Sequence, residues 1–136
     1  MSGRVSKSLP DGSVEAWIEE GSRIAHVRFA PNTSLTGAQG NVMVEVMGEL
    51  VKDGAPKPFA LLADAGGVIG TDADYRTVTG DFFGAHREIS YIAVLNLHPV
   101  IRVVAEMFRV GMGLSLRTFS NEAAAREWLR AQGIDR

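Results

Sequence analysis

The sequence FALLAD at residues 59–64 decides the fold. An apolar run of this length, closed by the carboxylate of Asp64, is typical of a central strand that is covered on both faces of its sheet. A second run of the same kind, YIAVL at residues 91–95, follows later in the chain. Apolar residues repeat at helical spacing on either side of the first run, at residues 38–53 and from residue 75 onward. Because strands that are separated by helices need crossover connections, most of the sheet should be parallel.

The N-terminal part of the chain has a different pattern. Residues 13–20 and 23–29 alternate between apolar and polar side chains on either side of a short break. This alternation predicts an antiparallel hairpin with one exposed face. Residues 1–12 are polar and contain a turn signal, so we expect a flexible leader there and a single folded domain over residues 13–136.

Trp17 is the informative residue of the predicted hairpin. It shares a strand face with Glu15 and Glu19, and no helix is obviously left to cover that face. An exposed tryptophan there would mark an interface, and the count of helices against strands favours self-association as a homodimer. The alternative is that the leader folds back over Trp17 within one chain.

The C-terminal part completes the predicted fold. Pro99 suits the first position of a third helix, residues 116–119 predict a short edge-like strand, and Ser120 is a suitable cap for a fourth helix. The expected buried side of that last helix comprises Ala124, Ala125, Trp128 and Leu129. We expect Trp128 to anchor it to the core. The predicted order is ββαβαβαβα, an α/β fold with a mixed, mostly parallel five-stranded sheet and four helices.

Composition and charge exclude several classes of function. Apolar residues make up 46% and charged residues 22% of the chain, as in an ordinary globular protein. The net charge of −2 and the lack of a basic cluster argue against nucleic acid as a partner. No cysteine is present, which rules out disulfides and zinc–thiolate sites. The sequence has no apolar stretch that would span a membrane and no signal peptide, so the cytoplasm is the expected location.

Several loose motifs form one ordered set along the chain. They are LLAD at residues 61–64, Gly67-Val68, Thr71-Asp72, Arg76, IAVL at 92–95, PVIRVVA at 99–105, and FSNE at 119–122 with Ala125, Trp128 and Leu129. In combination and order, this set resembles the STAS domain, the fold of bacterial anti-sigma-factor antagonists and of sulfate-transporter cytoplasmic tails. The resemblance runs from Glu15 to the end of the chain and is greatest to a branch of small bacterial STAS-like proteins.

The resemblance also implies where a site should lie. In regulatory STAS domains, a serine at the start of the helix after the third strand is phosphorylated by a partner kinase. Here Asp72 matches the family's aspartate, but Ala73 stands where that serine would be, and Thr71 is displaced by two positions. The resemblance therefore implies an interaction module without the usual phosphorylatable serine. The residues expected to meet a ligand or partner are Asp64, Thr71, Asp72, Arg76 and Arg102.

The glycine-rich loop at residues 66–70 invites a nucleotide-binding interpretation, because it follows a strand and opens a helix. Its glycines lack the spacing of the known phosphate-binding motifs, and Asp72 and Asp74 would repel a phosphate, so a turn with a helix cap is favoured. Two interpretations remain open for Asp64. Its carboxylate could face a ligand at the end of the strand, or it could accept backbone hydrogen bonds from the loop that follows. The histidines have no metal or triad spacing, so we expect no metal and no cofactor.

Three hypotheses for the function remain. The first is a non-enzymatic interaction or regulatory module that binds itself or another protein. The second is a domain that binds a small apolar ligand between helices and sheet, which a buried cavity free of convergent polar groups would favour. The third and least favoured is an enzyme that uses Asp64, His98 and Arg102, which a cleft with strongly shifted titrating groups would favour.

Overall fold

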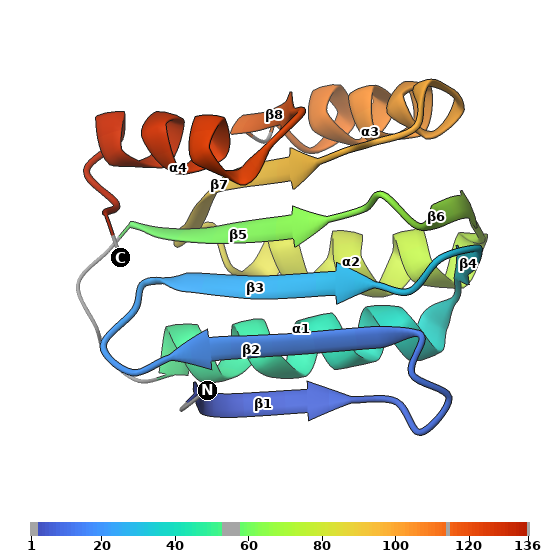
Figure 1. Cartoon of the computed structure of the whole chain (residues 1–136), viewed down its shortest axis with the longest axis horizontal. Coiled ribbons are helices and arrows are strands. Elements are labelled where there is room, and N and C mark those ends of the chain that lie inside the picture. Colours follow the sequence, from blue (N-terminus) through green and yellow to red (C-terminus); the bar gives the residue numbers. More distant parts are fainter. Residues whose placement is uncertain (1–2, 53–57, 114, 136) are drawn as a thin grey trace.

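The structure is a computed structural model that describes residues 3–52, 58–113 and 115–135. Within these ranges the chain forms eight strands and four helices (Figure 1). In chain order the elements are β1 (Gly3–Ser8), β2 (Val14–Glu19), β3 (Ile24–Phe29), β4 (Thr33–Leu35), α1 (Gly37–Lys52), β5 (Phe59–Asp64), β6 (Val68–Thr71), α2 (Ala73–Ala85), β7 (Ile89–Leu95), α3 (Pro99–Met112), β8 (Ser115–Phe119) and α4 (Glu122–Ala131).

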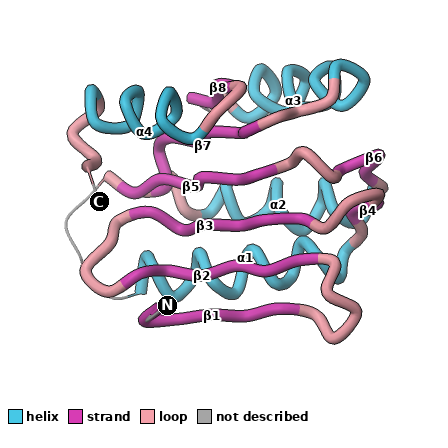
Figure 2. The backbone as a smooth tube through the Cα atoms, viewed as in Figure 1, coloured by secondary structure: helices cyan, strands magenta, loops and turns pink. Residues whose placement is uncertain are grey.

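A six-stranded sheet in the order β1-β2-β3-β5-β7-β8 forms the middle of the fold. The strands β3, β5, β7 and β8 pair in parallel, while β1, β2 and β3 pair in antiparallel fashion at the other side of the sheet. A separate pair, β4 with β6, lies beyond the carboxyl ends of β3 and β5 (Figure 2). The mixed, mostly parallel sheet, the antiparallel N-terminal hairpin and the four helices confirm the predicted fold class.

The prediction of a flexible leader was wrong for residues 3–8. They form β1, which pairs with β2 along the edge of the sheet, so the sheet has six strands instead of the expected five. The segment is mostly polar, as suits an edge strand that is open to water, and Val5 packs partly against the core. Ser6 stands opposite Trp17 in this pairing. The N-terminal segment therefore lies beside Trp17 in the sheet and does not fold over it.

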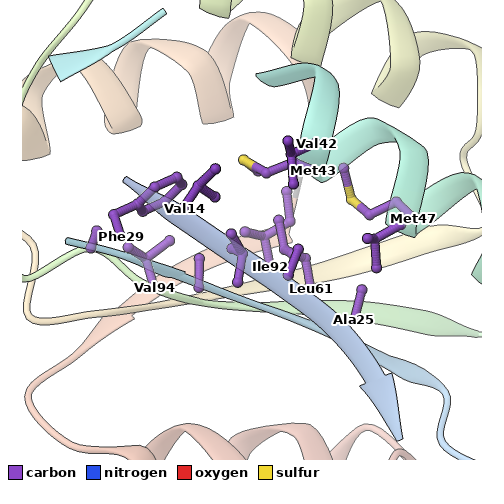
Figure 3. Packing of buried hydrophobic residues seen from close by; sticks show 14 of the residues in the cluster. Val14, Ala25, Phe29, Val42, Met43, Met47, Leu61, Ile92 and Val94 are labelled. Carbon is purple, nitrogen blue, oxygen red and sulfur yellow. The ribbon is translucent and has the colours of Figure 1, made fainter. Parts of the chain in front are cut away.

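The helices cover the two faces of the sheet unequally. Residues of α1, α2 and α3 join one hydrophobic cluster with one face, and Figure 3 shows Met43 and Met47 of α1 extending toward the sheet residues Leu61 and Ile92. The other face carries α4, which packs against β7 and β8. In Figure 1 no helix lies in front of the part of this face that β1 and β2 form. On this face, β1 and β2 are left without a helical layer in the described structure.

Side-chain caps mark the starts of two helices. Asp72 accepts a hydrogen bond from the backbone N–H of Tyr75 at 2.8 Å, which confirms the helix start predicted there. At α4 the predicted cap was one residue early. Asn121, and not Ser120, accepts the backbone N–H of Ala124 at 2.8 Å. The two side chains are neighbours of similar capping preference, so the sequence alone does not separate them.

The buried side of α4 is narrower than expected. Ala125 and Leu129 are fully buried, one turn apart, whereas Ala124 is exposed. Trp128 is half-buried, with its ring 5.7 Å from that of Tyr91 between centroids. Leu129 is therefore the main apolar anchor of the helix, and Trp128 covers the rim of the contact.

Candidate functional site

A cavity of about 110 Å³ lies between the sheet and the helices α1, α2 and α3. The sheet contributes Leu61, Ala63, Ile92 and Val94 to its lining. The helices contribute Met43 from α1, Phe83 from α2, and Ile101 and Ala105 from α3. Figure 3 shows Phe29 near Val94, and these two residues lie at the carboxyl ends of β3 and β7. The lining is almost entirely apolar, so the cavity suits a small apolar molecule better than a polar one.

The few polar groups of the lining are engaged within the protein. The hydroxyl of Tyr75 contacts Sδ of Met43 at 3.2 Å, and the hydroxyl of Thr79 donates to the carbonyl of Tyr75 at 2.8 Å. Burial raises the pKa of Tyr75 far above its ordinary value, so the phenol stays protonated. Neither group offers a base or a nucleophile to a ligand in the cavity.

The segment that joins β6 to α2 forms the polar edge of the cavity. Arg76 donates through Nη1 to the hydroxyl oxygen of Thr71 at 2.9 Å and to its carbonyl at 3.3 Å. Both side chains line the cavity, whereas Asp72 serves as the helix cap. Ala73 is the first residue of α2 and has no hydroxyl. Three of the residues expected to meet a ligand or partner therefore lie together, two of them at the cavity.

The other expected site residues lie apart from the cavity. Asp64 accepts the backbone N–H of Gly66 at 3.1 Å and faces the side-chain amide of Asn96 at 3.5 Å, so one of its oxygens stabilises the loop after β5. Arg102 is exposed near the start of α3, and His98 is exposed just before that helix. None of Asp64, His98 and Arg102 is among the described residues that line the cavity.

The face of the sheet that α4 leaves open carries a second cluster of interest. Trp17 on β2 stacks on His26 of β3, with the rings 5.1 Å apart and nearly parallel. The guanidinium of Arg28 lies 5.7 Å from the centre of the Trp17 ring and pairs with Glu15 at 2.7 Å. We call Glu15, Trp17, His26 and Arg28 the Trp17 patch. It is a mixed polar and aromatic surface without a helix over it.

His26 lies on the same face of β3 as the exposed Arg28, but its own side chain is buried. The residue is only 5% exposed because Trp17 stacks on it, and its Nε2 has no hydrogen-bond partner among the described residues. Burial, helped by the positive charge of Arg126, lowers the pKa of His26, while Glu19 and Glu122 oppose the shift. No sequence signal separates a stacked, buried histidine from an exposed one in an alternating strand.

The low pKa of His26 predicts a loss of stability in acid. Below about pH 6.5 the unfolded chain takes up a proton that folded His26 resists, so stability falls as the pH drops, by at most about 1.4 kcal/mol per pH unit. Urea denaturation at pH 7.5 and pH 5 should show a smaller fall for His26→Phe than for the wild type. His86→Asn, at a half-exposed histidine, should keep the full wild-type fall. Equal falls in the wild type and His26→Phe would contradict the prediction.

Residues 3–52, 58–113 and 115–135 offer neither a metal site nor a membrane-spanning helix. No group of histidine, aspartate and glutamate side chains there could hold a metal ion. None of the helices in those ranges is both long and apolar enough to cross a membrane.

The sheet order, the antiparallel N-terminal hairpin and the helix that begins after β6 define a STAS-like α/β domain. More narrowly, the chain belongs to the SpoIIAA-like family, whose model matches residues 26–130. The fold is also that of a solved structure, an uncharacterized protein from the DUF3478 family with a SpoIIAA-like fold from Shewanella loihica PV-4. The TM-score is 0.65 at 13% identity, over 95% of this chain and 98% of that one. No curated protein matches the sequence.

Proposed function

We propose that this chain is a non-enzymatic STAS-like binding module that holds a small apolar ligand between its sheet and the helices α1, α2 and α3. The observation that carries the proposal is the cavity, whose lining is almost entirely apolar. The polar side chains of Tyr75 and Thr79 are already hydrogen-bonded within the protein. An enzyme would need reactive groups that converge on its substrate, and a pocket of this composition favours binding over chemistry.

The size of the cavity sets the size of the ligand. An engineered apolar cavity of about 150 Å³ stays dry and binds benzene, so a cavity of about 110 Å³ encloses a slightly smaller apolar group. A ligand of roughly six heavy atoms that gains about 0.7 kcal/mol per atom would bind with a dissociation constant of about 1 mM. Part of a larger molecule, such as toluene, can extend through the open side of the pocket.

Filling the cavity should abolish binding. Ala105 is half-buried on α3 and lines the cavity, and leucine favours helices, so Ala105→Leu places apolar volume where the ligand would sit. Toluene is titrated into the protein while the amide chemical shifts are recorded. We expect these shifts to change saturably in the wild type, as for binding at one site. The variant should bind toluene at least about tenfold more weakly, because most of its apolar contact is lost.

Ala124→Leu is the matched control, since Ala124 is exposed on α4 at the other face of the sheet. It makes the same change in side-chain volume away from the cavity and should bind toluene as the wild type does. Equal affinity of the wild type and Ala105→Leu for toluene would show that the probe binds elsewhere and would exclude the cavity as the site.

A second candidate function is self-association through the Trp17 patch. The observation that favours it is an aromatic surface that, within the described part of the chain, neither a helix nor the N-terminal strand covers, since β1 lies beside Trp17. The pair of Glu15 and Arg28 makes this surface self-complementary, because two-fold symmetry would set each charge against the opposite charge of the second copy. Sedimentation equilibrium of the wild type at high concentration should then show a dimer, and a monomer would remove this candidate.

A further inference from the structure

We infer that the ligand of the cavity is a monocarboxylate, with its apolar tail in the cavity and its carboxylate on Arg76 and Thr71. The inference rests on the proposed function and adds the chemistry of the polar end of the ligand. Arg76 is the one exposed side chain among the described residues that line the cavity, so the opening of the pocket lies beside a guanidinium. An apolar chamber with a cation at its entrance fits an amphipathic anion.

The pairing of Arg76 differs from that of other arginines in the chain. Several of them form ion pairs with a glutamate, among them Arg28, Arg109, Arg126 and Arg130. Among the described residues Arg76 is in no such pair, although Asp72 and Asp74 lie close to it in sequence. Its hydrogen bonds go instead to the hydroxyl and carbonyl oxygens of Thr71. The charge of Arg76 is therefore held in place without being neutralised by a carboxylate of the described chain.

The geometry leaves donors for an incoming carboxylate. A guanidinium has five N–H groups in a planar fork, and Nη1 is the atom that holds Thr71. The remaining N–H groups can donate two parallel hydrogen bonds to a carboxylate, the bidentate arrangement that arginine favours. The hydroxyl of Thr71 accepts from Arg76, which leaves its own O–H to donate to the same anion.

The acidic residues nearby restrict the charge of the ligand. Asp72 uses its carboxylate to cap α2, and Asp74 is exposed in the first turn of the same helix. Neither lines the cavity, but both would repel a doubly charged anion more strongly than a singly charged one. A single carboxylate therefore suits the entrance better than a phosphate. With the cavity at about 110 Å³, the enclosed tail has about four to six carbons, as in a short-chain acid such as hexanoate.

The test compares hexanoate with 1-hexanol, which has the same number of carbon atoms and no charge, by calorimetric titration at pH 7.5. We expect the wild type to bind hexanoate at least about tenfold more tightly than hexanol, since hydrogen bonds to a charged group are the stronger kind. In Arg76→Gln the ratio of the two dissociation constants should fall to about one. Arg130→Gln, on the exposed side of α4, should keep the wild-type ratio. If Arg76→Gln does not fold, loss of the hexanoate preference at high salt tests the same charge on the wild type.

The possible outcomes separate this inference from the proposed function. Equal binding of hexanoate and hexanol to the wild type would overturn the carboxylate assignment and leave the apolar pocket standing. Binding of neither probe, nor of toluene, would overturn both. A hexanoate preference that survives in Arg76→Gln would place the carboxylate on another cation and overturn the assignment to Arg76.

Discussion

Alanine in place of Gly67 is expected to lower the free energy of unfolding by about 3 kcal/mol, the upper range for an overpacked site. A Cβ atom at Gly67 would lie 2.2 Å from the carbonyl oxygen of Ala30 and 2.8 Å from Cα of Pro31. Both obstacles are backbone atoms, so no side chain can rotate away to make room. Urea denaturation of the wild type and Gly67→Ala measures the difference directly.

The backbone around Gly67 has little freedom to move aside. Its carbonyl accepts the N–H of Thr33 at 2.8 Å, which joins the loop after β5 to the start of β4. The carbonyl of Ala30 is in turn held by the hydroxyl of Thr33 at 2.6 Å, and the N–H of Ala30 donates to Ser13 at 3.0 Å. Relief of the clash would therefore break contacts that position the β4–β6 pair beside the cavity.

Gly48→Ala is the matched control for this prediction. A Cβ at Gly48, within α1, would meet no atom within 4 Å. Alanine is the better helix former, so this change should raise stability by up to about 1 kcal/mol. If Gly67→Ala were as stable as the wild type, the close approach of the two loops would not exist in solution.

Glutamate in place of Trp17 is expected to convert the proposed dimer into monomers. An aromatic residue at the centre of an interface typically contributes about 2 kcal/mol or more, which corresponds to about a 30-fold rise in the dissociation constant. The new carboxylate would also lie beside Glu15 and face its own copy across the two-fold axis. Sedimentation equilibrium of the wild type and Trp17→Glu over the same concentration range measures the change.

Two further variants separate loss of the interface from loss of the fold. Arg28→Glu keeps Trp17 but inverts a charge of the Trp17 patch, and it should weaken the dimer as well. Lys52→Glu also removes one exposed ion pair, with Glu49, but on α1 at the opposite face of the sheet, and it should leave the dimer intact. A dimer of Trp17→Glu as tight as that of the wild type would refute the role of the patch.

Much of the fold could be predicted because its signals are local. The runs at residues 59–63 and 91–95 are apolar throughout, as is typical of a strand covered on both faces, and they lie in β5 and β7. Aspartate is a residue type that often caps helices, and Asp72 is the N-cap of α2. The strand β1 was not predicted because backbone hydrogen bonds hold it to β2. Such bonds do not require apolar side chains, so a polar strand at a sheet edge has no apolar pattern in its sequence.

The candidate site was less accessible to sequence reasoning. Thr71 and Arg76 were found through the family resemblance, and the structure places both at the cavity. The cavity itself lies among ordinary core residues such as Leu61, Val94 and Ile101, which look the same in a sequence whether they enclose a space or fill it. His26 is buried because Trp17 of the neighbouring strand β2 stacks on it, and the sequence of β3 alone does not indicate this contact.

The central claim is that the apolar cavity binds a ligand, and contacts between a bound probe and the cavity walls test it most directly. With toluene at saturation, nuclear Overhauser effects between its protons and protein methyl groups report atoms that lie close together. We expect such effects to the methyl groups of Met43, Val94 and Ile101, which reach the cavity from α1, β7 and α3. Effects confined to the Trp17 ring, or no saturable change up to the solubility limit of toluene, would contradict the claim.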